Sequence, residues 1–292
     1  MRAVRLDDEG LPELANLPEP TGAGELVRVL ACGLCGSDVE KLGSRAAAGS
    51  VLGHEVVGEL EDGRSVTVMH RVPCGRCERC RAGHESTCET FRELAIAPGG
   101  FAERLRATAL VPLPAALREL DGVWVEPLAC VLRALERVPR GRVLVVGLGA
   151  VGQLWTQVLC RRGDEPVAAE PREDRRAQAA ALGAVHDDGA VDAAVATSAA
   201  GVNDALARLE PGGTLLVFAA PAGLVPTALE AVYRKELQVV GSRSASPETF
   251  AAAAALLPEL SLPEPTVLPL ERFAEGVDLY RRGDALKVVF AP

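Results

Sequence analysis

The sequence lacks the features that mark membrane-spanning and nucleic-acid-binding proteins. None of its apolar runs approaches the ~20 residues that a membrane span requires. The first residues contain no apolar segment of the kind found in a secretory signal peptide. Acidic residues outnumber basic ones by 40 to 31, and the net charge of −9 argues against a surface for nucleic acid or anionic membranes. We therefore expect a cytoplasmic protein that binds neither nucleic acid nor membrane.

The composition predicts a globular protein of two domains that uses its cysteines for metal binding or catalysis. A chain of 292 residues can bury two hydrophobic cores, and a content of 48% hydrophobic and 24% charged residues is typical of a folded globular protein. Basic residues are nearly all arginine, since lysine occurs only at Lys41, Lys235 and Lys287. Eight cysteines in a cytoplasmic protein favour metal binding or catalysis over a disulfide framework.

A stretch near the middle of the chain has the pattern of a dinucleotide-binding turn. Residues 143–146 form an unbroken apolar run, typical of a strand covered on both faces, and a helix is expected from Val151 to about Arg162. The intervening glycines would allow a tight bend, close approach of the backbone to a pyrophosphate, and close packing of helix on strand. A glycine-rich turn without a ligand is the alternative. The candidate cofactor-binding residues are Gly147, Gly149, Ala150, Val151, Gly152 and Glu170.

Glu170 follows the next apolar run and favours NAD as the cofactor. A carboxylate there can pair with the free ribose diol and repels a 2′-phosphate. Arg172, Arg175 and Arg176 follow closely and leave NADP open, although we interpret them as a solvated helix face. Further apolar runs alternate with helical segments, which predicts a doubly wound parallel sheet. These runs are residues 192–196, 213–218 and 237–240.

Four cysteines lie close together in a polar, glycine-containing segment, residues 74–88. Their spacing is C-x2-C-x2-C-x7-C, and the segment has almost no apolar residues to fold around. A tetrahedral zinc ion bound by four thiolates would supply the missing stabilisation, and an iron–sulfur cluster is the chemical alternative. The candidate ligands are Cys74, Cys77, Cys80 and Cys88, whereas His84 is expected to be solvated.

A second set of possible metal ligands lies nearer the N-terminus. The pair Cys32-x-x-Cys35 is followed by a Gly-His-Glu motif that contains His54 and Glu55. A thiolate, an imidazole and a carboxylate suit zinc, and a catalytic zinc keeps one position open for water or substrate. Read alone, the cysteines could equally be a redox pair or two packed thiols, and the histidine could be a hydrogen-bonded residue at a strand end.

In this order, the motifs resemble those of the zinc-containing medium-chain alcohol/polyol dehydrogenases, the family of sorbitol, glucose and threonine dehydrogenases. Further matches are the motifs at residues 100–103, 125–129 and 287–292, so that the resemblance spans essentially the whole chain. It implies an α/β protein with a GroES-like, β-rich catalytic domain and a Rossmann domain with a doubly wound parallel sheet. The implied boundaries are 1–124 and 243–292 for the catalytic domain, with a structural zinc lobe at 74–88, and 125–242 for the Rossmann domain.

The resemblance also assigns the ligands of a catalytic zinc. Cys35 and His54 would be the first two ligands, and Glu55 would bind directly or alternate with Glu126. Cys32 would then be a packed thiol rather than a ligand. Cys74, Cys77, Cys80 and Cys88 would bind the structural zinc.

Three residues next to Cys35 receive roles in proton transfer and ligand orientation. Ser37 matches the hydroxyl that accepts the substrate proton, and Asp38 matches a carboxylate that orients the ligand imidazole. Glu40 stands where some members carry a histidine at the outer end of a proton relay. A glutamate there is familiar among the sugar dehydrogenases, and a surface glutamate is the alternative. We expect a sugar or polyol substrate on this ground.

The implied reaction is the NAD(P)-dependent oxidation of a secondary hydroxyl group of a sugar or polyol. Zinc lowers the pKa of the alcohol so that an alkoxide can exist near neutral pH, and hydride passes to the nicotinamide. The implied cofactors are two zinc ions per chain and NAD, with NADP not excluded, and the implied assembly is a homodimer or homotetramer. The alternatives are a dehydrogenase of a simple alcohol or a threonine-like amino alcohol, and a catalytically idle cofactor-binding protein of the same fold.

Overall fold

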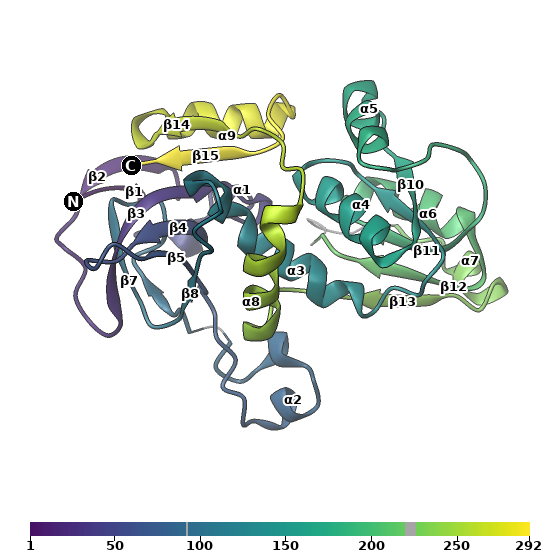
Figure 1. Cartoon of the computed structure of the whole chain (residues 1–292), viewed down its shortest axis with the longest axis horizontal. Coiled ribbons are helices and arrows are strands. Elements are labelled where there is room, and N and C mark those ends of the chain that lie inside the picture. Colours follow the sequence, from purple (N-terminus) through teal and green to yellow (C-terminus); the bar gives the residue numbers. More distant parts are fainter. Residues whose placement is uncertain (92, 220–225) are drawn as a thin grey trace. The chain divides into compact units, whose positions relative to one another are not determined.

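The computed structural model describes residues 1–91, 93–219 and 226–292 (Figure 1). The chain forms two compact units. The first consists of Met1–Ala129 and Ala245–Pro292, and the second of Cys130–Ser244. Within the described residues, no helix is both long and apolar enough to cross a membrane.

The first unit is built on an eight-stranded sheet in which the C-terminal strand is an interior member. The order is β14-β15-β3-β4-β5-β8, with β7 also paired to β3 and β6 to β7. Only β14 and β15 are parallel to each other, and the remaining pairs are antiparallel. The strands are β3 (Glu25–Gly33), β4 (Glu55–Glu59), β5 (Ser65–Val68), β6 (Ile96–Ala97), β7 (Arg104–Ala107), β8 (Leu110–Pro112), β14 (Thr266–Pro269) and β15 (Val288–Ala291).

A hairpin of β1 (Arg2–Leu6) and β2 (Pro12–Asn16) adds a two-stranded sheet to this unit. The residues of β2 are exposed or half-buried, so that no apolar alternation marks it.

Three phenylalanines attach the C-terminal return to the sheet of the first unit. Phe290 of β15 stacks on Phe273 at 4.7 Å between ring centroids, and Phe101 meets both rings edge-on at 4.9 and 5.4 Å. Phe273 begins α9 (Phe273–Arg282), which runs beside β15 (Figure 1). This core fixes the position of the last residues before β15, where Lys287 lies.

Besides α9, the described part of the first unit contains two helices of four residues and one of ten residues. They are α1 (Gly36–Val39), α2 (Glu78–Arg81) and α8 (Pro247–Leu256), while α3 (Val125–Leu135) crosses the boundary between the units. Ser246 caps α8 through reciprocal hydrogen bonds with Thr249. The helix ends at Leu256 and a 3-10 turn follows, because Pro258 has no N–H to continue the helix.

The second unit contains a five-stranded parallel sheet of order β10-β9-β11-β12-β13. In chain order this is 2-1-3-4-5, so the direction of winding reverses between β9 and β11, as in a doubly wound fold. A further strand beyond β10 is reduced to one isolated parallel bridge between Val167 and Val185. The strands are β9 (Arg142–Val146), β10 (Glu165–Ala169), β11 (Val191–Ala196), β12 (Leu209–Val217) and β13 (Gln238–Gly241). The helices are α4 (Ala150–Arg162), α5 (Glu173–Ala181), α6 (Val202–Arg208) and α7 (Leu229–Arg234).

Candidate active site

Cys35, His54 and Glu55 are brought together by the pairing of two antiparallel strands. Gly33, the last residue of β3, lies opposite Glu55, the first residue of β4. Cys35 follows β3 by two residues and His54 precedes β4 directly, so that the strand ends carry all three side chains to one place. Their potential donor atoms lie within 4.8 Å of one another, and the histidine and glutamate are buried. This donor set suits a zinc ion with one coordination position left for another ligand.

Asp38 holds the imidazole of His54 in a fixed orientation. Its side chain is 1% exposed, and Oδ1 lies 3.3 Å from His54 Nδ1. The backbone N–H groups of Cys35 and Gly53 donate to the same carboxylate, at 3.2 and 3.3 Å. With Nδ1 turned to Asp38, Nε2 is the nitrogen left to a metal, as in carboxylate–histidine–metal arrangements.

Asp38 and His54 also shift each other's pKa. Burial opposes the imidazolium of His54, but Asp38 and Cys35 outweigh it and hold the pKa of His54 well above its usual value in the metal-free protein. Burial would raise the pKa of Asp38, yet the charge and hydrogen bond of His54 bring it below the usual value. A metal at Nε2 therefore has to replace a proton.

Lys287 forms a buried ion pair with Glu55 that the sequence did not predict. The ammonium group donates to Oε2 of Glu55, and both side chains are 4% exposed. The same ammonium lies 5.2 Å from the ring centroid of Trp124. Either partner alone would be an uncompensated buried charge, so separating the two groups is costly. The pair therefore fixes the position of the Glu55 carboxylate beside the cluster. In the sequence, Lys287 stands out only because nearly all other basic residues are arginines.

Glu126 and Cys32 lie outside the cluster of donor atoms. Glu126 is the second residue of α3 and is 7% exposed, but the group within 4.8 Å that the described residues form comprises Cys35, His54 and Glu55. Cys32 is fully buried, its Sγ is 3.7 Å from the carbonyl oxygen of Gly33, and burial raises the pKa of its thiol well above the usual value. The structure thus brings Glu55 rather than Glu126 to the other two ligand candidates.

Ser37 and Glu40 lie on α1, next to Cys35. Ser37 Oγ donates to Cys35 Sγ at 3.4 Å, and Glu40 is the exposed C-cap of the helix. Tyr280 of α9 covers this helix, since its Oη lies 2.7 Å from where a Cβ at Gly36 would stand. Burial and then the charges of Cys35, Glu55 and Glu40 raise the pKa of Tyr280 to about 12, so its hydroxyl stays protonated at neutral pH.

His70 is a second histidine at the cluster, and the sequence gave no prediction for it. Val57 of β4 pairs with Thr67 of β5, and continuing this antiparallel register places His54 opposite His70. The two ring centroids are 4.6 Å apart. Burial, and next the neighbouring His54, hold the pKa of His70 well below its usual value. Only the register of β4 and β5 indicates that His70 lies beside His54, and this register cannot be deduced from the sequence alone.

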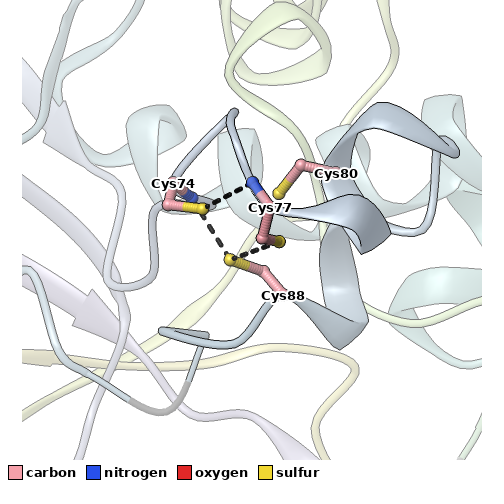
Figure 2. A group of neighbouring side chains, drawn as sticks. All are labelled: Cys74, Cys77, Cys80 and Cys88. Carbon is pink, nitrogen blue, oxygen red and sulfur yellow. Dashed lines mark hydrogen bonds between the residues drawn. The ribbon is translucent and has the colours of Figure 1, made fainter.

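The four cysteines of residues 74–88 turn their sulfur atoms toward one another (Figure 2). All four lie within 4.8 Å of one another, which suits one tetrahedral metal ion. Backbone N–H groups of Cys74 and Cys77 donate to sulfur atoms of Cys88 and Cys74 at 3.3 and 3.4 Å. The bond from the N–H of Cys74, and next that with Thr90, lower the pKa of Cys88 to about 6. His84 is exposed beside the group.

The glycine turn after β9 has the conformation that a dinucleotide requires. Gly147 has a φ of +87°, which a side chain would strain. A Cβ on Gly152 would lie 2.1 Å from the carbonyl oxygen of Gly147, so the helix can approach the turn only without one. A Cβ on Gly149 would meet only Arg175 Nη1, at 4.0 Å, so the backbone there is open to a ligand. Ala150 and Val151 begin α4, whose first N–H groups are available to an anion.

Glu170 lies directly after β10 and is joined to the glycine turn. Its side chain is 5% exposed and accepts from the backbone N–H of Leu148 at 2.8 Å and of Arg172 at 3.1 Å. Arg172 pairs with Asp174 on an exposed face, as expected. Arg175 departs from that expectation, because it is only 17% exposed and its Nη1 lies 3.9 Å from Glu170 Oε2. A cation therefore stands beside the turn together with the carboxylate.

Comparison with known proteins gives one family match and several long relatives. Residues 23–115 match the alcohol dehydrogenase GroES-like domain. D-altritol 5-dehydrogenase of Agrobacterium fabrum is 33% identical over 285 residues, covering 84% of each chain. Sorbitol dehydrogenase of Halalkalibacterium halodurans is 27% identical over 94% of each chain, and L-galactonate-5-dehydrogenase of Escherichia coli is 27% identical over 84% of this chain and 83% of that one.

Solved structures share the whole fold. A protein described as a zinc-binding dehydrogenase from Sinorhizobium meliloti 1021, bound to NADP, has a TM-score of 0.85 at 25% identity and covers all of this chain and 99% of its own. An alcohol dehydrogenase from Thermus sp. ATN1 has a TM-score of 0.84 at 26% identity with the same coverage.

Proposed function

The chain belongs to the family of zinc-containing medium-chain alcohol and polyol dehydrogenases, and from this premise we propose that it oxidises a secondary hydroxyl group of a sugar or polyol and passes the hydride to a nicotinamide nucleotide. The gathering of Cys35, His54 and Glu55 within 4.8 Å is the observation that carries the proposal. The substrate class follows from the long relatives, which are named for D-altritol, sorbitol and L-galactonate.

Cys35, His54 and Glu55 would hold the catalytic zinc ion, with Glu126 as an alternative carboxylate. When bound, zinc supplies Lewis acidity to the hydroxyl oxygen of the substrate. Asp38 keeps His54 Nε2 aimed at the ion. Lys287 holds Glu55 at the cluster and balances its charge.

Ser37 and Glu40 would carry the proton of the substrate hydroxyl away from the site. Ser37 Oγ lies 3.4 Å from Cys35 Sγ, beside the proposed ion, and can accept the proton while releasing its own. Glu40 ends the same helix and can pass a proton to solvent. Tyr280 stays protonated and covers Gly36, which shields this side of the cluster from water.

The cysteine lobe would hold a second, structural zinc ion through Cys74, Cys77, Cys80 and Cys88. All four sulfur atoms are within mutual reach, and no coordination position would be left for a substrate. The lobe has few apolar residues, so the ion would act by stabilising the fold of this segment.

The nicotinamide nucleotide would bind at the turn formed by Gly147, Gly149 and Gly152. Its pyrophosphate would lie at the open backbone of Gly149 and the first N–H groups of α4, at Ala150 and Val151. Glu170 favours NAD through the ribose diol, while the nearby guanidinium of Arg175 can tolerate a phosphate. We propose NAD as the preferred cofactor and NADP as a weaker one.

We further propose that the protein is cytoplasmic and forms a homodimer or homotetramer. Its partner in the reaction is a small-molecule sugar or polyol, and neither nucleic acid nor membrane is involved. Light scattering on the zinc-replete protein tests the assembly, and a single monomeric species would contradict it.

Formation of reduced nicotinamide, followed by absorbance, tests the proposed reaction. The zinc-replete protein is assayed with sugars, polyols, simple alcohols and threonine, with NAD and NADP in parallel. We expect turnover with polyhydroxy substrates and a higher kcat/KM with NAD. Turnover only with simple alcohols would contradict the substrate class, and no turnover with any substrate while nucleotide still binds would contradict the enzymatic role.

A further inference from the structure

His70 has a buried polar atom that the described residues leave without a partner. Its Nδ1 is inaccessible to solvent and lacks a hydrogen bond within that part of the chain. Buried polar atoms in native proteins are nearly always paired, and an unpaired one costs free energy. The backbone of His70 is itself anchored, since its carbonyl oxygen accepts from the N–H of Ala95 at 2.9 Å. The unpaired atom therefore points to a missing ligand rather than to an irregular loop.

The position of His70 relates this atom to the metal cluster. The ring lies 4.6 Å from that of His54, centroid to centroid, at an interplanar angle of 45°. Asp38 engages Nδ1 of His54, so the far side of that ring faces the proposed metal. The guanidinium of the neighbouring Arg71 lies over the ring of Phe91, 5.6 Å from its centroid.

We propose that His70 is a specificity-determining residue whose Nδ1 forms a hydrogen bond with a second hydroxyl group of a polyhydroxy substrate, next to the hydroxyl that is oxidised. This inference rests on the proposed function and deepens it. An uncharged imidazole offers one donor and one acceptor nitrogen, and a hydroxyl group can pair with either. A simple alcohol has no second hydroxyl and would leave Nδ1 unpaired in its complex.

Replacement of His70 by phenylalanine and by asparagine tests this assignment. Phenylalanine keeps a planar ring without nitrogen, whereas an asparagine amide can place a polar atom near the position of Nδ1. The variants H70F and H70N are compared with the wild type for kcat/KM with a polyol and with 2-butanol, and for zinc content by metal analysis. His84→Asn, at an exposed position of the cysteine lobe, is the control for loss of a histidine.

We expect H70F to lower kcat/KM for the polyol about five- to tenfold, the value of one hydrogen bond, and to change that for 2-butanol less than about twofold. H70N should recover most of the polyol activity, and both variants should keep the zinc content of the wild type. Equal losses on both substrates, or loss of zinc, would overturn the assignment, because His70 would then only support His54. A wild type that oxidises 2-butanol but no polyhydroxy substrate would overturn the proposed substrate class and this inference together, whereas an unchanged polyol preference in H70F overturns the inference alone.

Discussion

At the scale of single residues, the candidate catalytic site depends on charges that compensate one another in a buried place. Asp38 balances His54, and Lys287 balances Glu55. The first pair joins residues of neighbouring motifs, and the resemblance to a family predicts it. The second joins residues 232 positions apart, and no local pattern in the sequence connects them. The contact exists because β15 pairs with β3, which only the folded sheet reveals.

The raised pKa of His54 predicts that zinc binding at this site weakens as the pH falls. In the metal-free protein the imidazole stays protonated up to a pH above its usual pKa, and a metal must displace that proton. Affinity should therefore rise about tenfold per pH unit until the raised pKa is passed, and then become independent of this group. Competition with a chelator at several pH values measures it. Asp38→Asn removes the main stabiliser of the imidazolium, so the proton should compete less with zinc, and the zinc affinity of the variant should become independent of His54 at a lower pH than in the wild type. Equal pH profiles would contradict the pairing.

Replacing Lys287 with methionine should destabilise the metal-free protein by about 3–5 kcal/mol, because Glu55 is left as an uncompensated buried charge. Zinc supplies a positive charge at the same place, so the loss should be smaller in the zinc-replete protein. Urea unfolding of both forms measures the difference. Lys41→Met, at an exposed position, is the control and should change stability little. Equal stability of K287M and the wild type without metal would contradict the buried pair.

At the scale of elements, most of the second unit could be predicted from hydrophobic patterns. Strands β9 and β11 and helix α4 begin and end within about one residue of the predicted segments, because apolar runs and glycines mark them clearly. The side chain of Arg175 could not be placed in this way. Its helix looks solvated in sequence, and only the folded turn shows that it approaches Gly149.

The glycines of the turn should respond differently to alanine. Gly152→Ala places a Cβ 2.1 Å from a backbone oxygen, so it should lower stability by about 1–3 kcal/mol. Gly149→Ala meets nothing closer than 4.0 Å and should fold normally, but its methyl group occupies the proposed place of the pyrophosphate. Nucleotide titration by fluorescence and thermal unfolding separate the two effects. Wild-type nucleotide affinity in Gly149→Ala would contradict the placement of the cofactor.

At the scale of the whole molecule, the order of the motifs carried more information than any one of them. The family and the two kinds of sheet follow from that order, since each motif taken singly also suits other kinds of site. The reduction of the strand beyond β10 to a single bridge at Val185 was not predicted. The segment between α5 and β11, residues 182–190, contains no apolar run longer than Ala184-Val185, so no hydrophobic pattern marks a strand there.

If a zinc ion at Cys35, His54 and Glu55 makes this chain a polyol dehydrogenase, Cys35→Ala should abolish its turnover. The decisive measurement is polyol-dependent nicotinamide reduction by this variant and the wild type, with zinc content and nucleotide binding determined on the same samples. The wild type should turn over and hold two zinc ions, one for each cluster of ligands. The variant should lose turnover and one zinc ion while it still binds nucleotide. Wild-type turnover in Cys35→Ala would contradict a catalytic zinc ion at Cys35, His54 and Glu55.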